Sequence, residues 1–475
     1  MRRCLTFARG IAVIGCASLA ACQTFSQDGG MSVTADIAGQ ILNKRVGAIR
    51  SEEDKAAARA EVERLLKRPL TADSTVQIAM LNNRGLQGAY NELGIAEAIR
   101  VQQSLPPNPH FSVTRITGSV ETEIERQIVG SILAIATLPV RSEIAAERFH
   151  QAQLAAALET LRVAAEARRA FYRAVAAQEI VGLFTQANEA AETMTELAKR
   201  LAETGAMNRL DQTRQQAFHS DVAIRLTSAQ QRASRERERL VRALGLWGND
   251  LKFTLPKSLP PLPKRPFVLP TVEQEALRRR VDLQIARIEL ETLAKSYGLT
   301  NATRFINILD AGYADKLTKE TATGERVRDR GFTVSFEVPL FDFGEARVRE
   351  AEQTYMQAVN RLAQKAVNVR SEAREAYRSY RATYDIAAHY QRNVLPLRKV
   401  ISDEMMLRYG AMQVDVFTLL LEAQQKLNAS AAASDALRDF WLASADLSTA
   451  TTGGGMDSGD APNVAFPAPG GSAGH

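Results

Sequence analysis

Two acidic residues, Asp211 and Asp415, occur in similar sequence contexts, because each follows a Gly-Ala-Met tripeptide. The stretch GAMNRLD begins at Gly205, and GAMQVD begins at Gly410, 205 residues later (410 − 205). Glycine suits the left-handed backbone at the end of a helix. A carboxylate is favoured at the start of the next helix by the helix dipole. The pattern therefore predicts two helix–turn–helix hairpins. Arg209 is a candidate ion-pair partner for Asp211, although a surface pair would contribute little.

Residues that could perform catalysis or hold a metal are scattered along the chain. The histidines form no His-x₃-His or Cys/His cluster, and they are His110, His150, His219, His389 and His475. The sequence has no glycine-rich phosphate loop and no nucleophile elbow. Methionines such as Met405 and Met406 lie in helical stretches, where packing is a commoner role than soft-metal transfer. We expect no enzyme activity, no metal site and no cofactor other than a covalent lipid.

The N-terminus predicts export and lipid attachment. Three arginines precede the apolar run GIAVIGCASLA, which is typical of a secretory signal peptide at residues 1–21. Leu19, Ala20, Ala21 and Cys22 follow, and they resemble a bacterial lipobox. That resemblance implies a diacylglycerol on the Cys22 thiol and a further acyl chain, such as palmitate, on the new N-terminus. It also implies the outer membrane, because Gln23 stands where Asp would favour retention in the inner membrane. The alternative is an ordinary signal peptide that contains a cysteine.

Composition and charge narrow the class of protein. The 475 residues are 45% hydrophobic and only 6% aromatic, which favours long helices. Removing residues 1–21 takes away three arginines, so the net charge falls from +6 to +3 (6 − 3). A nearly balanced charge gives no argument for nucleic-acid binding. Cleavage also removes Cys4 and Cys16, so we expect no disulfide.

The two halves of the chain repeat each other. AMLNNRGLQ begins at Ala79 and ALRRRVDLQ begins at Ala276. Each is followed by a helical stretch, two strand-like stretches, a long helix, the Gly-Ala-Met stretch and another helix. We therefore predict a signal peptide (1–21), a lipidated N-terminal segment (22–69), a first repeat (70–254), a proline-rich extended linker (255–271), a second repeat (272–450) and a disordered tail (451–475).

A long helix is predicted over residues 345–395. Its apolar positions recur at a mean spacing close to 3.5, which is typical of a coiled-coil seam. These positions are Val348, Ala351, Tyr355, Val359, Leu362, Ala366, Val369, Ala373, Ala376, Tyr380, Tyr384 and Ala387. Pro396 should kink or end this run, and the helical pattern resumes to about residue 408. A helix of ~60 residues is ~90 Å long. The seam alone would also fit a helical bundle or a filament.

Two stretches predict strands whose faces differ. In GFTVSFEVPLF, Phe332, Val334, Phe336 and Val338 alternate with polar residues. Residues 124–138 have a length that suits a tilted barrel strand, and the charged residues 315–330 suit an external loop. The sequence holds about four strands, and a barrel needs about eight. Either the strands form a soluble sheet, or several chains share one barrel, and three chains would supply twelve strands.

Residues 70–450 resemble the TolC-like outer-membrane efflux protein family, in its lipoprotein branch. The resemblance rests on the two-fold repeat, PPNPHFSV, VPLFDFGEARVREAE and RYGAMQVDVFTLLLEAQQKL. It implies a mainly helical fold with a membrane β part, in which a homotrimer forms a 12-stranded β-barrel continued by a periplasmic α-helical coiled-coil barrel. It further implies the outer-membrane exit channel of a tripartite efflux or secretion system, with a periplasmic adaptor and an inner-membrane pump as partners.

The resemblance also assigns the hairpin residues. Gly205 and Gly410 would lie at the periplasmic tip, and Asp211 and Asp415 would form an acidic gate of six carboxylates in three chains. The sequence departs from the family at Thr418, where some members have a second acid. It departs again where the first half has LPVRSEIAAE in place of VPLFDFGEAR. The alternatives are a lipid-anchored periplasmic adaptor, disfavoured by the two hairpins, and a structural coiled-coil lipoprotein, which would need no alternating strands.

Overall fold

The structure is a computed structural model that describes residues 25–44 and 46–453. Cys22 and the lipobox residues Leu19, Ala20 and Ala21 lie outside the described residues, as does the predicted tail beyond residue 453. The described chain divides into two compact units. The sheet unit holds residues 25–33, 91–155 and 283–365, and the hairpin unit holds the remainder. Each repeat contributes to both units.

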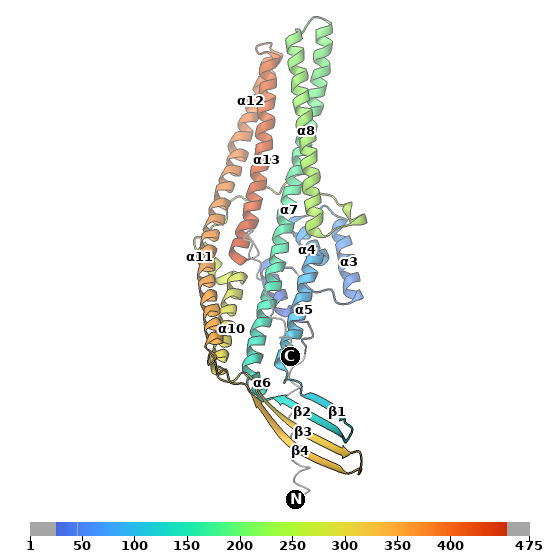
Figure 1. Cartoon of the computed structure of the whole chain (residues 1–475). Coiled ribbons are helices and arrows are strands. Elements are labelled where there is room, and N and C mark those ends of the chain that lie inside the picture. The colour runs from blue at the N-terminus through green and yellow to red at the C-terminus, as the bar shows by residue number, and fades with distance from the viewer. Residues whose placement is uncertain (1–24, 45, 454–475) are drawn as a thin grey trace. The chain divides into compact units, whose positions relative to one another are not determined.

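The sheet unit contains four antiparallel strands in the order β1-β2-β3-β4 (Figure 1). They are β1 (His110–Thr117), β2 (Glu121–Ser131), β3 (Leu309–Glu320) and β4 (Arg326–Phe336). The first repeat supplies the β1–β2 hairpin and the second supplies β3–β4. The two hairpins join through β2 and β3, where Ile128 lies opposite Tyr313. The sheet thus has four strands, as predicted, and β1 and β4 form its edges.

One strand prediction and one loop prediction were wrong in their bounds. The predicted strand at residues 124–138 ends at Ser131, whose hydroxyl accepts a hydrogen bond from the Ala134 amide and caps helix α6 (Ile132–Ala136). A short apolar run such as ILAIA fits a strand and a buried helix equally well. The charged residues 315–330 are mostly strand, and only 321–325 form the turn. Their charges pair across the strands, as Asp315 does with Arg328.

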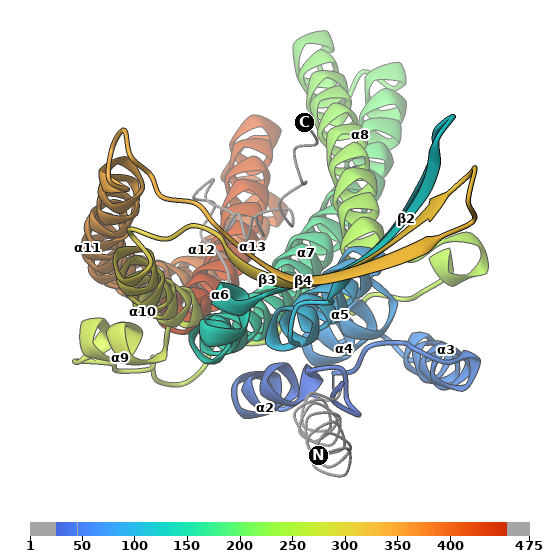
Figure 2. The same ribbon diagram turned by 60° about the horizontal axis from the view of Figure 1, so that its bottom comes forward.

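Helices make up most of the described chain, and their order repeats (Figure 2). They are α2 (Met31–Leu42), α3 (Glu52–Leu66), α4 (Ala72–Asn82), α5 (Arg84–Ser104), α7 (Leu138–Glu203), α8 (Arg209–Leu244), the 3₁₀ segment η1 (Gly248–Leu251), α9 (Val272–Arg279), α10 (Val281–Ala302), α11 (Glu345–His389), the π-helical segment η2 (Tyr390–Val394), α12 (Leu395–Gly410) and α13 (Val416–Thr452). Among the described residues, no helix is long and apolar enough to cross a membrane.

The start of each repeat has the same local structure. Ala79 and Ala276 are both fully buried. Each accepts a hydrogen bond from the residue that ends its helix, Asn83 for α4 and Arg280 for α9, and both of these residues are extended. This agrees with the predicted duplication at the point where AMLNNRGLQ and ALRRRVDLQ align.

The burial of the predicted seam residues differs between the two ends of the long helix. In the hairpin unit its residues are buried from Val369 to Ala387, whereas in the sheet unit Val348 and Tyr355 are only half-buried. The kink predicted at Pro396 is the π-helical segment η2, in which the Leu395 amide donates to the Tyr390 carbonyl. Proline has no amide proton to donate, so the helix changes its hydrogen-bond pattern next to it.

The proline-rich linker is hydrogen-bonded to helices of the hairpin unit. The Tyr384 hydroxyl donates to the carbonyls of Pro263 and Lys264, both at 3.1 Å. The Phe267 amide donates to the Tyr380 hydroxyl at 3.0 Å. The indole of Trp441 on α13 donates to Pro260 at 3.0 Å. The linker is therefore held against α11 and α13 by the seam tyrosines and one tryptophan.

The two strand-to-helix connections differ, as the missing aromatic-Asp-Gly motif in the first half predicted. Before α11, Phe343 and Gly344 both have a positive φ, and the Asp342 carboxylate accepts from the Gly344 amide at 3.0 Å. A side chain on Gly344 would collide with the Arg304 carbonyl. In the first half, LPVRSEIAAE begins helix α7 directly after α6, without such a corner.

Candidate functional site

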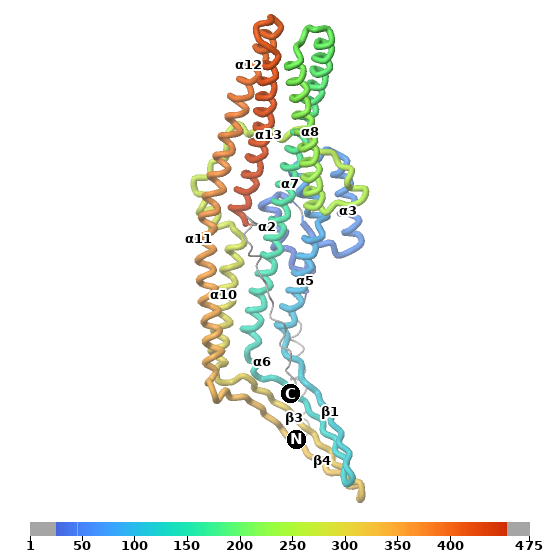
Figure 3. The backbone as a smooth tube through the Cα atoms, turned by 45° about the horizontal axis from the view of Figure 1, so that its top comes forward, coloured from blue at the N-terminus to red at the C-terminus, as the bar shows by residue number. Residues whose placement is uncertain are grey.

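The two hairpin turns have the same backbone geometry. After α7, Gly205 is left-handed (φ 76°), and the Ala206 amide donates to the Leu201 carbonyl at 2.8 Å. After α12, Met412 is left-handed (φ 59°), and the Gln413 amide donates to the Arg408 carbonyl at 2.9 Å. Both turns are Schellman-type helix ends. Figure 3 shows each as a tight bend at the end of its helix pair.

The left-handed residue predicted at Gly410 is therefore wrong. Gly410 is the last residue of α12, and Met412 takes the left-handed position two residues later. Gly205 and Met412 each lie three residues before the residue that caps the next helix, which is Asn208 for α8 and Asp415 for α13. The two Gly-Ala-Met tripeptides are thus two residues out of structural register.

With this register, the two acidic residues no longer occupy equivalent positions in the two repeats. Asp415 corresponds in position to Asn208, because both cap a helix, and Asp211 corresponds to Thr418, because both lie three residues further on. The acid that seemed absent at Thr418 is present in the first repeat, as Asp211. Each turn therefore carries one carboxylate, but at different positions of the helix start.

Both carboxylates have local hydrogen-bond partners. Asp415 Oδ1 accepts from the Thr418 amide at 2.9 Å and from its hydroxyl at 2.5 Å. These two bonds, with a smaller contribution from the positive charge of Arg214, hold the pKa of Asp415 below its usual value. Asp415 is therefore ionised at neutral pH. In the other turn, Asn208 Nδ2 donates to Asp211 Oδ2 at 2.7 Å, and Asn208 Oδ1 accepts from the Asp211 amide at 2.8 Å.

The basic residue beside these carboxylates is Arg214. Its Nη1 lies 3.4 Å from Asp211 Oδ1, and its guanidinium stacks over the Phe417 ring of α13, 4.7 Å from the ring centroid. Arg209, the residue singled out from the sequence, forms no ion pair with Asp211 in the described part of the chain. The helical spacing of three residues between Asp211 and Arg214 is the signal that could have identified it.

The two faces of the sheet differ in polarity. One face, called here the apolar face, carries Phe111, Ile128, Tyr313 and Phe332 in one row across all four strands. Phe332 is 87% exposed. Val334 and Phe336 continue the apolar face toward the helices. Ser112, Gln127, Ala314 and Gly331 form a row on the opposite face. An exposed apolar area of this kind marks a surface that contacts a membrane or another protein.

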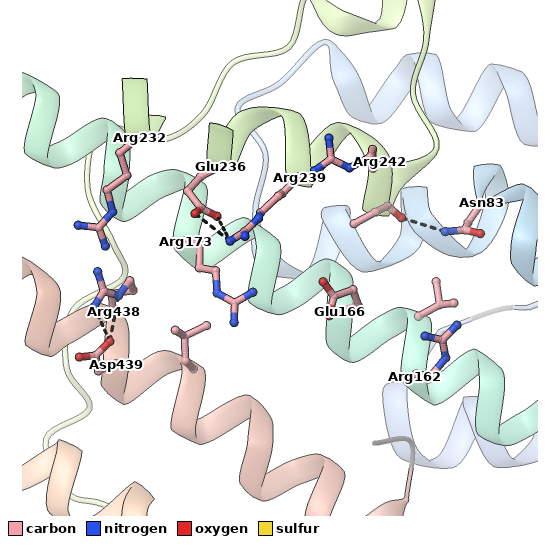
Figure 4. Close-up of a pocket in the computed structure, with 13 residues that line it drawn as sticks. Asn83, Arg162, Glu166, Arg173, Arg232, Glu236, Arg239, Arg242, Arg438 and Asp439 are labelled. Atoms are coloured by element: carbon pink, nitrogen blue, oxygen red, sulfur yellow. Dashed lines mark hydrogen bonds and ion pairs between the residues drawn. The ribbon is translucent and has the colours of Figure 1, made fainter. Parts of the chain in front are cut away.

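The hairpin unit also contains an arginine-lined cavity of about 820 Å³ between α7, α8 and α13 (Figure 4). Six arginines and three acidic residues line it, namely Arg162, Arg173, Arg232, Arg239, Arg242, Arg438, Glu166, Glu236 and Asp439. Glu236 pairs with Arg239 at 3.1 Å. Arg162 pairs with Glu159, and Arg232 pairs with Asp435. Arg438 pairs with both Asp435 and Asp439, so acids already match most of these arginines. No group of three or more His, Cys, Asp or Glu in the described ranges could hold a metal ion.

Comparisons with known proteins agree with this arrangement. Residues 272–401 match the family model described as outer membrane efflux protein. The crystal structure of CusC has a TM-score of 0.68 at 17% identity, over 82% of this chain and 94% of CusC. The CmeC outer membrane channel of Campylobacter jejuni has a TM-score of 0.62 at 16% identity, over 88% and 91% of the two chains.

A third solved structure is the MtrE outer membrane channel of Neisseria gonorrhoeae in its open state, with a TM-score of 0.64 at 16% identity over 80% of this chain and 88% of MtrE. A comparison with curated protein sequences gave no match. The predicted resemblance to the TolC-like outer-membrane efflux proteins is confirmed: residues 272–401 match their family model, and the chain shares its fold with the solved outer-membrane channels.

Proposed function

We propose that this protein is the outer-membrane exit channel of a tripartite efflux or secretion system, in which three copies share one 12-stranded β-barrel. The observation that carries the proposal is the four-stranded sheet with an apolar face and two free edges. Open edges are not tolerated in lipid, and four strands are too few to close a barrel. Because four is an even number, β4 of one copy lies antiparallel to β1 of the next, and three copies close a ring.

The strand lengths support this placement. Strands β2 and β4 have 11 residues and β3 has 12, which is the length of a tilted strand that crosses a bilayer. The apolar face would contact lipid, and the opposite face would line water. The half-buried seam residues Val348 and Tyr355 would be covered by helices of a neighbouring copy in a periplasmic α-helical coiled-coil barrel.

The N-terminus and the partners complete the proposal. Cys22 would carry the diacylglycerol and acyl chains that anchor the protein to the outer membrane, and no other cofactor is required. The helical part would lie in the periplasm, where the hairpin turns would meet a periplasmic adaptor and an inner-membrane pump. Energy would come from the pump, so the channel itself would catalyse no reaction.

The hairpin turns would form the constriction. Three copies would gather six carboxylates from Asp211 and Asp415, and Arg214 would balance part of this charge because it contacts Asp211 directly. Net negative charge at a narrow point favours cations. The lowered pKa of Asp415 keeps that carboxylate charged well below neutral pH.

A lipid-anchored adaptor is the second candidate. Its single hairpin and compact β-domains would leave the second helical hairpin of this chain without a role. An adaptor would also give no reason for an exposed apolar sheet face that includes Phe332 and Val334. The exit channel accounts for both features.

Conductance in a planar bilayer tests the proposed constriction. We expect the purified full-length protein to form a small cation-preferring pore. In Asp211→Asn/Asp415→Asn the cation preference should weaken several-fold, because the six carboxylates become neutral amides. Lowering the pH of the wild type to about 5 should preserve most of the preference, since Asp415 stays ionised there.

Asp403→Asn is the matched control, because Asp403 is an exposed acid on α12 outside the turns. It should leave the selectivity unchanged. A pore whose selectivity is the same in the double variant would leave Asp415 as a helix cap and Asp211 as the local partner of Asn208 and Arg214. Absence of a pore from a protein that is also monomeric would contradict the channel.

A further inference from the structure

The two faces of the sheet carry opposite charge. The apolar face holds six basic residues and one acid, which are Arg115, Arg126, Lys319, Arg326, Arg328, Arg330 and Asp315. The other face holds six acids and one base, which are Glu121, Glu123, Glu125, Asp310, Glu320, Asp329 and Lys316. These assignments follow from the strand register, because successive side chains point to opposite faces. The apolar face therefore carries a formal charge of +5 (6 − 1), although it is the face that we propose contacts lipid.

The basic residues are confined to one end of that face. Phe111, Ile128, Tyr313 and Phe332 form the last row without charge before the turns of the two β-hairpins, at residues 118–120 and 321–325. The next row contains Arg126, Asp315 and Arg330, and the rows beyond it contain the other four basic residues. The apolar face thus changes from an apolar band near the helices to a basic belt near the β-hairpin turns. We define the basic belt as these six basic residues together with Asp315.

Asp315 organises the centre of the belt. Its two oxygens each accept from Arg328 at 2.6 Å, and Arg330 and Arg126 lie 3.6 and 3.9 Å away. The Asp315 side chain is 10% exposed, whereas those of the three arginines are 50–58% exposed. One carboxylate cannot neutralise three guanidinium groups. Each guanidinium has five N–H donors, so Asp315 leaves donors of the half-exposed Arg126 and Arg330 available to a further anion.

We propose that the basic belt binds the phosphate groups of anionic lipid headgroups at the outward surface of the membrane. Arginine binds phosphate through paired N–H donors. The adjoining apolar band would contact the acyl chains of the same lipids, so one lipid would meet both surfaces. A cluster of this charge on a lipid-facing surface would be costly without such a counter-ion. The proposal rests on the proposed membrane placement of the sheet.

Native mass spectrometry of the full-length protein tests the belt. The protein, in a neutral detergent, is titrated with phosphatidylglycerol, with lipid A bearing two phosphates, or with zwitterionic phosphatidylcholine. The variant is Arg115→Gln/Arg126→Gln/Arg330→Gln, which lowers the charge of the belt from +5 to +2 and keeps the Arg328–Asp315 pair. We expect at least a tenfold loss of affinity for both anionic lipids and no change for phosphatidylcholine, whose phosphate is balanced by its choline. The control Arg349→Gln/Arg361→Gln/Arg378→Gln removes three exposed arginines from α11 and should leave binding unchanged.

A second readout separates this inference from the proposed function. The mature chain has no cysteine other than Cys22, so Val334→Cys gives one labelling site for a fluorophore within the apolar band. Quenching by a lipid-soluble quencher in vesicles would place the band in lipid. If the label is quenched but the triple variant binds anionic lipid as the wild type does, the belt is not a lipid site and the membrane placement stands. If the label is not quenched, the membrane placement itself is wrong.

Discussion

At the scale of single residues, Gly205 and Met412 carry the geometry of the hairpin turns. Both adopt the left-handed backbone that ends a helix, although methionine is strained there and glycine is not. A Cβ added at Gly205 would have no heavy atom within 4 Å beyond its two chain neighbours. The preference for glycine at this position is therefore conformational and does not come from packing.

Gly205→Ala should destabilise the first turn by about 1 kcal/mol, because a Cβ disfavours the left-handed region by roughly that amount. Hydrogen exchange should detect this as about fivefold faster exchange of the Ala206 and Met207 amides, which donate to Leu201. Met412→Gly should slow exchange in the second turn, since it relieves the strain.

Gly182→Ala is the control for this prediction. Gly182 lies inside α7 with open space around it, so alanine should stabilise the helix by about 0.5–1 kcal/mol. Unchanged protection in Gly205→Ala would mean that the turn does not depend on glycine.

The sequence predicted that these turns exist but not how they align. The tripeptide repeat drew attention to the correct segments, yet it aligned Gly205 with Gly410 and Asp211 with Asp415. The hydrogen bonds of the helix ends set the true register, and tripeptide identity does not report it. Arg214 could have been identified from its position three residues after Asp211. Its contact with Phe417 could not, because that contact joins two helices that are far apart in the sequence.

At the scale of elements, apolar periodicity predicted the long helices and the strands, but it failed at their ends. The run after Ser131 continues the apolar pattern of β2 and still becomes helix α6, because the Ser131 hydroxyl caps it. The charged segment predicted as a loop is strand, because its charges find partners across the sheet. Both errors come from contacts that a one-dimensional pattern does not contain.

Tyr384→Phe tests how the proline-rich linker is held. The variant removes the hydroxyl that donates to the carbonyls of Pro263 and Lys264, which should cost about 1 kcal/mol locally. Limited trypsin digestion should then cut after Lys264 several-fold faster than in the wild type. Tyr355→Phe is the control, because the Tyr355 hydroxyl forms no hydrogen bond within the described residues. Equal cutting rates in the two variants would show that the linker does not depend on Tyr384.

At the scale of the whole molecule, the central claim is that one chain is an incomplete channel. Among the residues that the structure describes, a single copy has a four-stranded sheet whose edge strands, β1 and β4, lack a partner on one side. It also leaves apolar residues of the sheet exposed and part of the α11 seam half-buried. Three copies in a ring would satisfy all of these surfaces at once, which is why we infer the trimer from the sheet rather than from the helices.

Cross-linking of the sheet edges tests this claim most directly. Val113→Cys on β1 is combined in turn with Arg330→Cys, Phe332→Cys or Val334→Cys on β4, all on the apolar face, and the protein is oxidised in native membranes. Directly opposite residues of adjacent strands lie within disulfide range. The account predicts that at least one pair gives covalent dimers and trimers, with nothing larger, and that each single variant stays monomeric on a non-reducing gel. Monomers only, from all three pairs, would contradict a barrel shared by three chains.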